Sequence, residues 1–510
     1  NPVERTYFGP DGKPAIREGG YASVRITYDE HSRVVETAYY GVRGEPVRND
    51  EWVALRKSVW DDWGNELESR MSGPDGKPTR HKVGHSILKR RYNERNVAIE
   101  WAYFNPDGKP TWNEDGVAMI KLKVDALGRE HERSHHDPSG RLINDASGTA
   151  TIRRTLDERG RPTSRAWFDA LGRPQTRRDG SSSEAISYDL LGRQTEVSRH
   201  DARGKLLGSQ GGAVWATRRN EYDDRGFLVA ESYHDDTGAP VPAQEGAASI
   251  RMKRDEHGRV LEWIHFDVAG KPVKTKSGYA IVRTNLDARG RQVEWLYFDG
   301  EGRRTRNDEG YSGSRASYDE RGFRAESAFF DENDKPVLTA GGIASVRRKF
   351  DDRGNVVSER YFGVDGAPKS NASGYAGADY KYDDCDRQVE RVLVERDGAP
   401  GKRFLSTRKK YDDRGNVVEL ALFDSEGKPA AGADGVSIER TVRDERGRVS
   451  EVSFFDRTEK PVRSPSRGGA VVRNTYDDNG VKREEVALDA SGNVIKTRKF
   501  DATGKEVPGG

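Results

Sequence analysis

The chain has 510 residues, of which 33% are hydrophobic and 34% are charged, and it contains 56 glycines and 21 prolines. A compact globule of this length carries closer to half apolar residues, so the composition excludes several thick-cored domains. Disordered chains have this balance, and so do repeat proteins whose cores stay thin as the chain grows. The 9 tryptophans, 20 tyrosines and 16 phenylalanines, many at regular spacing, favour a repeat protein.

The charge and the cysteine content exclude further classes of protein. Lysine plus arginine (87) nearly equals aspartate plus glutamate (85), so the net charge of +2 predicts no nucleic-acid partner. The single cysteine, Cys385, excludes an intramolecular disulfide framework and a cysteine-cluster zinc site. No apolar run approaches the ~20 residues that cross a bilayer, so we expect no membrane-spanning segment. The chain begins at Asn1 without a leader, and we expect any targeting signal to have been removed or to lie outside it.

Two short motifs alternate along the chain. The first runs from Tyr7 to Pro14 and pairs an aromatic residue with a glycine-containing turn; it recurs at Tyr39–Pro46, Tyr103–Pro110, Trp167–Pro174, Tyr297–Arg304, Tyr361–Pro368 and Leu422–Pro429. The second begins with Tyr28-Asp29; its counterparts start at Trp60, Tyr92, Leu156, Tyr188, Tyr222, Leu286, Tyr318, Phe350, Tyr382, Tyr411 and Tyr476. This self-similarity predicts one repeat array.

The repeat length is 32 residues in most copies. It becomes 34 between Tyr188 and Tyr222 and 29 between Tyr382 and Tyr411. About 16 units fill residues 1–510 without a linker. We therefore expect a single continuous array, and a segment of a longer chain or assembly.

Each motif contains a hairpin turn of the form aromatic-Asp-x-x-Gly. The aspartate is expected to cap the turn amides, and the glycine to accept the left-handed conformation that closes the turn. Asp157 to Gly160 and Asp351 to Gly354 are examples. Proline just after many turns, as at Pro14 and Pro272, is typical of a strand edge or start.

The segments between turns alternate with the period of a strand. Val24, Ile26 and Tyr28 share one face, whereas Ser23 and Arg25 share the other. The remaining arm of each unit, such as 272–279, is expected to form a short third strand plus a loop. The predicted fold is all-β: tandem hairpin or meander repeats of ~32 residues in one elongated, twisted, β-solenoid-like array that coils into a rod, spiral or shell.

The turns resemble the YD repeats of the Rhs and teneurin class. Tyr188 to Arg193, Tyr222 to Phe227 and Tyr318 to Phe323 carry the resemblance. It implies a long β-sheet that spirals into a hollow shell, around a toxin or beside an adhesive head. The present repeat is a 32-residue double unit, longer than that of the family. The family's self-cleavage signature has its nearest counterpart at Asp137 to Leu142, which we interpret as an ordinary repeat turn.

Some of the ten histidines lie close together in the sequence, which makes them candidate metal ligands. His135 and His136 are adjacent on a strand and so point to opposite faces, and His81 and His85 are four residues apart. Several histidines, namely His136, His200 and His234, occupy the slot that other units fill with Phe8, Phe168, Phe266 and Phe298. We therefore expect a semi-buried aromatic slot that tolerates imidazole.

Other candidates for chemistry have structural interpretations. The Asp-Asp pairs, which begin at Asp223, Asp351, Asp383, Asp412 and Asp477, could suggest calcium, but turn capping is favoured. Cys385 lies among carboxylates that disfavour a thiolate. The basic pairs that begin at Arg153, Arg218, Arg347 and Lys409 predict a solvated, mutually paired face. Trp52, Trp60, Trp63, Trp101 and Trp112 could form a carbohydrate platform, but their repeat slots favour a core role. We predict no enzyme, and no catalytic, cofactor-binding or metal-binding residue.

The chain starts in the middle of a hairpin, and neither end shows a polar cap; it closes with Pro508 to Gly510. We therefore expect either a longer array or ends that neighbouring copies or a covering domain cover. The function expected first is a non-enzymatic structural β-repeat protein of a bacterial extracellular or cell-surface assembly, polymerising end to end into filaments. The alternative is a YD-type shell or adhesin module that encapsulates a protein cargo or binds a partner or glycan.

Overall fold

A computed structural model describes residues 3–9, 12–17, 19–208, 215–395, 406–477, 480–501 and 504–507. Some residues named in the sequence analysis lie outside these ranges, namely Asn1, Asp478 and Pro508 to Gly510. The described residues form an all-β protein, as predicted: 32 strands make one sheet in which each strand pairs antiparallel with the next. One short 3-10 turn, η2 (Gln244–Gly246), interrupts the pattern.

The strands come in hairpins of one six-residue and one seven-residue strand. The sheet begins with β1 (Val3–Thr6). The six-residue strands are β2 (Ser23–Tyr28), β4 (Leu55–Trp60), β6 (Ile87–Tyr92), β8 (Met119–Val124), β10 (Thr151–Leu156), β12 (Ser183–Tyr188), β14 (Thr217–Tyr222), β16 (Ser249–Arg254), β18 (Ile281–Leu286), β20 (Gly313–Tyr318), β22 (Ser345–Phe350), β24 (Gly377–Tyr382), β26 (Ser406–Tyr411), β28 (Ile438–Arg443), β30 (Val471–Tyr476) and β32 (Val494–Lys499). The seven-residue strands are β3 (Val34–Tyr40), β5 (Glu66–Ser72), β7 (Ala98–Phe104), β9 (Glu130–His136), β11 (Pro162–Phe168), β13 (Gln194–His200), β15 (Leu228–His234), β17 (Val260–Phe266), β19 (Gln292–Phe298), β21 (Arg324–Phe330), β23 (Val356–Phe362), β25 (Gln388–Val394), β27 (Val417–Phe423), β29 (Val449–Phe455) and β31 (Lys482–Leu488).

The turn inside each hairpin, here called the YD turn, has the predicted chemistry. In the β18–β19 turn, Asp287 Oδ1 accepts the backbone N–H groups of Arg289 and Arg291, each at 2.9 Å. Gly290 adopts a φ of 79°. The backbone hydrogen bonds, followed by the guanidinium of Arg291, hold the pKa of the Asp287 carboxyl below its usual range. The aspartate therefore works as an ionised turn cap, as the sequence predicts.

The tyrosine of the YD motif joins one hairpin to the preceding one. Tyr318 at the end of β20 donates its hydroxyl hydrogen bond to the backbone carbonyl of Gln292 in β19, at 2.7 Å. Arg291 of the same earlier hairpin stacks on the Tyr318 ring, with its guanidinium carbon 4.4 Å from the ring centroid. Equivalent hydroxyl bonds are made by Tyr92, Tyr188, Tyr222, Tyr382, Tyr411 and Tyr476. The motif therefore encodes contacts between units as well as a turn.

One face of the sheet carries rows of ion pairs. Arg283 of β18 lies directly opposite Glu262 of β17, and its Nε donates to Glu262 Oε2 at 2.5 Å. The same guanidinium lies 4.4 Å from the centroid of the Phe298 ring. Many units repeat this Phe-Arg-Glu arrangement, so a chain with 34% charged residues still has a net charge near zero. Among the basic residues singled out in the sequence, Arg153 pairs with Glu132 at 2.8 Å and Arg347 pairs with Glu326 at 3.1 Å.

The third segment of most units differs from the prediction, because it forms no regular strand; in the last unit it forms β32, which pairs with β31. Phe298 and Arg304 make a single isolated bridge, and a third turn follows, closed by the hydrogen bond from Asn307 N to Tyr311 O. We call this segment the arm. Prolines 14, 46, 78, 110, 174, 240, 272, 336, 368, 429 and 461 stand at the bridge in other units, and a proline there cannot donate to a continuing ladder.

Neighbouring arms stack on one another through a hydrogen bond between their third turns. The N–H of Asp308 donates to Ser277 O at 2.9 Å, and that of Lys276 donates to Glu245 O at 3.0 Å. Tyr279, at the end of one third turn, packs on Tyr297 of β19 with ring centroids 4.8 Å apart. The arms thus cover the face opposite the Phe-Arg-Glu rows, and a thin core lies beneath them.

The core beneath the arms depends on a small residue that precedes each hairpin. Ala280 and Ser312 have no exposed surface. The Ala280 N–H donates to Phe298 O at 2.8 Å, and the Ser312 carbonyl accepts from Tyr297 N at 2.9 Å. Because each small slot is closed by its immediate neighbours, the core never thickens along the array.

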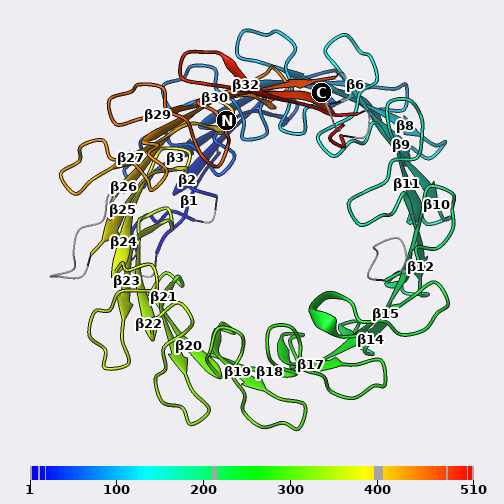
Figure 1. The fold of residues 1–510 in the computed structure, drawn as a ribbon. Helices are drawn as coiled ribbons and strands as arrows, with labels where there is room; N and C mark the ends of the chain where they lie inside the picture. Colours follow the sequence, from blue (N-terminus) through cyan, green and yellow to red (C-terminus); the bar gives the residue numbers. More distant parts are fainter. Residues whose placement is uncertain are drawn as a thin grey trace.

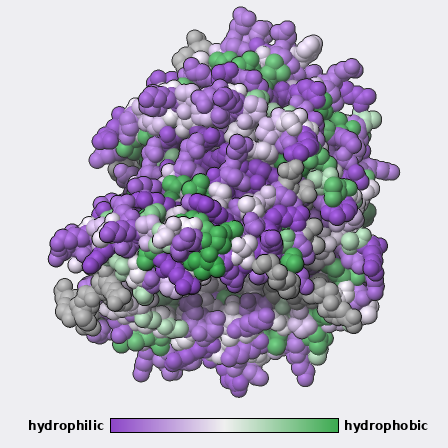
Figure 2. Space-filling view, turned by 45° about the horizontal axis from the view of Figure 1, so that its top comes forward, coloured by the Kyte–Doolittle hydropathy of each residue, from purple (hydrophilic) through white to green (hydrophobic). Residues whose placement is uncertain are grey.

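The sheet coils into a ring with an open centre (Figure 1). The strands nearest the two termini overlap at the top of this view, so the sheet is a spiral and not a straight rod. The η2 turn, which is the third turn of its unit, is the green coil on the inner side of the ring. The arm-covered face is therefore the inner face, and the Phe-Arg-Glu rows form the outer face. The visible surface is mainly hydrophilic, with separate hydrophobic patches (Figure 2).

Candidate functional site at the seam between turns

Successive turns of the spiral touch along a seam. On one side lie YD turns from the last third of the chain, within 351–447; on the other lie arms from the first third, within 17–148. The residues that hydrogen-bond across the seam are separated by 302 to 336 positions, or about ten repeats of 32 residues. The seam thus joins two different edges of one sheet: the turn edge, made of YD turns, and the arm edge, made of third turns and the residues before them.

In two YD turns, the side chain two residues after the capping aspartate extends across the seam. Arg353 Nη1 donates to the backbone carbonyls of Gly20 at 3.1 Å and of Arg48 at 3.0 Å. Asp386, in the neighbouring YD turn, pairs with the same guanidinium at 2.5 Å. Arg446 fills this slot further along, and its Nη2 donates to Asn144 O at 2.5 Å. Both arginines therefore satisfy carbonyls of the opposite arms.

Two further arginines reach in the other direction. Arg48 Nε donates to Asp384 Oδ2 at 2.7 Å, and Arg80 pairs with Asp413. Arg48 also donates to Thr79 Oγ1 at 2.7 Å, which fixes its direction. Both aspartates are second members of Asp-Asp pairs, so in these turns the first carboxylate caps the turn and the second binds the arginine opposite.

Two tryptophans pack in the seam. Trp52 adopts a φ of 68° in the third-turn slot where neighbouring units have a glycine. Its ring lies against Gly415, so closely that the site has no room for a Cβ atom. Arg387 lies 5.2 Å from the Trp52 ring centroid, and Arg446 lies 5.1 Å from that of Trp112. A bulky residue in the left-handed region is strained, and here the strained residue forms the contact between turns.

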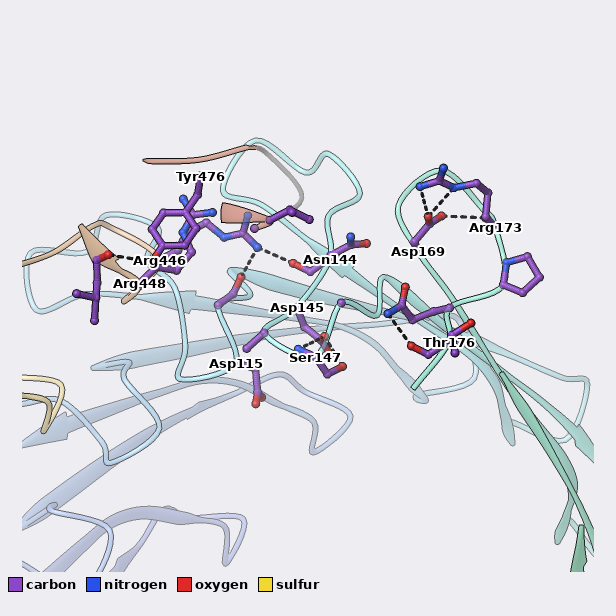
Figure 3. A pocket seen from close by; sticks show the side chains of 18 residues that line it. Asp115, Asn144, Asp145, Ser147, Asp169, Arg173, Thr176, Arg446, Arg448 and Tyr476 are labelled. Carbon is purple, nitrogen blue, oxygen red and sulfur yellow. Dashed lines mark hydrogen bonds and ion pairs between the residues drawn. The ribbon is translucent and has the colours of Figure 1, made fainter. Parts of the chain in front are cut away.

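A cavity of about 800 Å³ lies at the end of the seam. Arg446, Arg448 and Tyr476 line one side, and arm and turn residues that include Asp115, Asn144, Asp145, Asp169 and Arg173 line the other (Figure 3). The polar groups there are largely engaged: Asp169 pairs with Arg173 at 2.7 Å, and Ser147 donates to Asp145 at 2.6 Å. The arrangement fits a solvated gap where two walls diverge.

Asp383, Asp384 and Cys385 are close enough together to be considered as metal ligands. Asp383 already accepts two backbone N–H groups and pairs with Arg387 at 2.7 Å, while Asp384 pairs with Arg48. Burial, followed by the charge of Asp384, raises the pKa of the Cys385 thiol to about 11. The thiol is therefore protonated at neutral pH, and this turn is built for the seam.

The histidines in the phenylalanine slot occupy it as expected. His136 is buried; its Nδ1 lies 2.9 Å from Gly140 O and its Nε2 lies 2.9 Å from Ser134 Oγ. His234 repeats both contacts with Gly238 and Ser232. The slot thus replaces the phenyl ring by a hydrogen-bonded imidazole.

The expected core role of the tryptophans is wrong for three of them. Trp52 and Trp112 lie in the seam, and Trp63 is 77% exposed at the tip of a YD turn. Trp60 does occupy the YD tyrosine slot and donates to Val34 O at 2.9 Å. Sequence reasoning missed the seam itself; the one local signal was a tryptophan at position 52, where the repeat calls for glycine.

The fold and the seam define a class of protein: a β-hairpin repeat protein whose sheet coils into a spiral, with successive turns of the spiral in contact. No protein-family model matches the sequence, and no curated protein matches it. Within the described residues, no helix has the length and apolar character needed to cross a membrane.

Among solved structures, the chain is similar to TcdB2-TccC3-TEV, with 12% identity over 99% of this chain and 29% of that chain, and a TM-score of 0.31. The Photorhabdus luminescens Tc holotoxin pore gives the same identity, the same shares of both chains and the same TM-score. A porin-like protein from Bacteroides uniformis is 9% identical over 60% of this chain and 88% of that chain, with a TM-score of 0.16. The chain spans less than a third of the length of the first two.

Proposed function

We propose that this protein is a non-enzymatic structural module whose coiled sheet forms the wall of a shell around a macromolecular cargo, in an extracellular or cell-surface assembly. The seam is the observation that carries the proposal. A straight or loosely coiled sheet has no use for an arginine in one turn that binds carbonyls more than 300 residues away, as Arg353 does. A wall does, because lateral contacts between turns close the gap through which a cargo would be reached.

Two further features support an enclosing wall. The arms cover the inner face with short turns, while the outer face carries paired charges that keep it hydrated. The YD-type turns agree with this role, since the family that they resemble forms hollow shells.

Electron micrographs of the purified chain test the shape: hollow rings are expected in end views, and solid particles or straight rods would contradict the proposal. Thiol accessibility tests the shielding. In a Cys385→Ser background, Lys276→Cys places a thiol on an inner third turn, and Asn285→Cys places one on the outer face. Both positions are exposed in the structure.

A small maleimide should label both thiols at similar rates, because water reaches both faces. A maleimide on a long polyethylene glycol chain should label position 285 at least about tenfold faster than position 276, as the wall keeps bulky molecules outside. Equal labelling by the bulky reagent would show that the inner face is not shielded.

A further inference from the structure

The seam uses only part of each edge of the sheet. YD turns between 351 and 447 seat on arms between 17 and 148, as described above. None of the hydrogen bonds and ion pairs found across the seam in the described residues comes from the turn edge from 29 to 322 or from the arm edge that follows residue 176. The chain therefore displays one edge of each kind, and these edges are the two halves of a contact that it already makes with itself.

The free turn edge carries large apolar side chains at its contact slot. That slot, two residues after the capping aspartate, holds Arg353 and Arg446 in the seam. On the free edge it holds Trp63, Leu127 and Leu191 in three of the ten turns, where they are 77%, 74% and 75% exposed. The other seven turns hold an arginine or a histidine in this slot. These three exposed side chains occupy the same position of the turn in three alternate units, which is the position that contacts the opposite arms in the seam.

The free arm edge offers a matching surface. The residue before each third turn is Arg48, Arg80, Trp112 and Asn144 within the seam. Pro242 and Leu338 hold this position on the free arms; both are exposed, Leu338 to 38%. Apolar side chains thus stand at some contact positions of both free edges, as Trp112 does within the seam, while other free arms have Lys274 and Arg306 at this position.

We propose that a second copy of this chain seats its free arm edge on the free turn edge, so that copies stack coaxially and continue the spiral wall. The contact is heterologous, because it joins two different surfaces, and so it propagates from copy to copy without closing. It continues the geometry of the internal seam, with arginine or histidine at most contact slots of the turn edge and apolar side chains at Trp63, Leu127 and Leu191. This inference goes beyond the enclosing role and does not depend on what the lumen holds.

Sedimentation velocity and electron microscopy of the full chain test the stacking. The wild type should form linear stacks of rings that lengthen with protein concentration. A turn-edge variant, Trp63→Ser with Leu127→Ser and Leu191→Ser, should weaken association by at least about tenfold, because three apolar side chains lose their cover. The matched control replaces Leu171, Val268 and Val364 by serine. These residues are 67%, 53% and 52% exposed, and they lie in the turns that follow the seven-residue strands, not in YD turns.

An arm-edge variant, Pro242→Glu with Leu338→Glu, should also lose stacking. The decisive experiment is an equimolar mixture of the two variants, since each variant retains the edge that the other lacks. The mixture should form pairs of rings and nothing longer. A monomeric wild type, unchanged stacking of the turn-edge variant, or equal loss in the control would overturn the proposal. Intact single rings in any of these cases would leave the enclosing wall standing, so the two proposals fail separately.

Discussion

Trp52 lies against Gly415, a residue 363 positions further along the chain, and both residues have left-handed backbone conformations, with φ values of 68° and 82°. The tryptophan stands where neighbouring units have glycine, and the glycine leaves the space that the indole ring fills. A bulky residue in this region costs roughly 1–2 kcal/mol in the backbone, so the contact between turns holds a strained residue in place.

Gly415→Ala should open the seam, because the new Cβ would collide with the Trp52 ring. Gly447→Ala is the matched control: Gly447 has a φ of 83° in the equivalent turn, but its nearest neighbour is Arg414 Nη1 at 3.8 Å. Both variants should lose about 1 kcal/mol in the free energy of unfolding, because alanine is strained in the left-handed conformation. Only Gly415→Ala should also lose the contacts of the seam.

Alkylation of Cys385 provides the measurement, since this single cysteine is buried in a seam turn and its thiol pKa is raised to about 11. Gly415→Ala should speed alkylation and increase the radius of gyration in small-angle scattering. Equal alkylation rates in the two variants would mean that the tryptophan does not hold the turns together.

The arginine pairs should make the seam sensitive to salt. Asp384→Asn with Asp413→Asn removes the carboxylates that pair with Arg48 and Arg80, and should speed Cys385 alkylation at low salt. Each such pair contributes up to about 1 kcal/mol when partly exposed, and molar salt should reduce the difference between variant and wild type. Asp224→Asn is the control, because Asp224 holds the same turn position outside the seam. If the double variant behaves like this control, the two arginine–aspartate pairs do not stabilise the seam.

Tyr318→Phe should weaken the junction between two hairpins. It removes the hydroxyl bond to Gln292 O and leaves that carbonyl without the phenol, for an expected loss of about 1 kcal/mol in the free energy of unfolding. Tyr40→Phe is the control, because Tyr40 occupies a slot that holds phenylalanine in many units. Chemical denaturation followed by circular dichroism measures both. A loss of equal size in the two variants would assign the effect to the aromatic slots in general.

Acid should destabilise the first third of the array through His85. Burial, followed by the charge of His81, lowers the pKa of His85 to about 3, and its Nδ1 has no hydrogen-bond partner within the described residues. The unfolded chain binds the proton near the usual pKa of about 6.5, so the contribution of His85 is complete above that pH. It is lost at up to about 1.4 kcal/mol per pH unit as the pH falls from 6.5 towards 3.

His85→Val introduces the residue that Val53 and Val117 supply in the adjacent units. It should flatten the dependence of unfolding free energy on pH between about 6 and 4, where His85 would otherwise take up its proton. His257→Val, at an exposed turn, is the control variant. If His85→Val does not alter the slope of unfolding free energy against pH, the acid sensitivity arises from the carboxylates and not from His85.

Local sequence is enough to predict the hairpins and their turns. Asp287, Gly290 and Tyr318 act within one unit or between adjacent units, so short-range pattern and turn chemistry predict their roles. The arm was only partly predictable: a proline at the bridge position indicates an edge, but the third turn and its stacking on the neighbouring arm depend on packing against Tyr297 and its equivalents.

The tertiary structure alone decided the curvature of the sheet. Each strand adds a small rotation, and the sum over more than 300 residues brings Arg353 beside Gly20 and Trp52 beside Gly415. No local pattern reports such a sum, because a slight change in rotation per strand would place different residues opposite one another. The sequence therefore determined the repeating unit, and only the accumulated twist decided which units meet, because pairing is local and curvature is not.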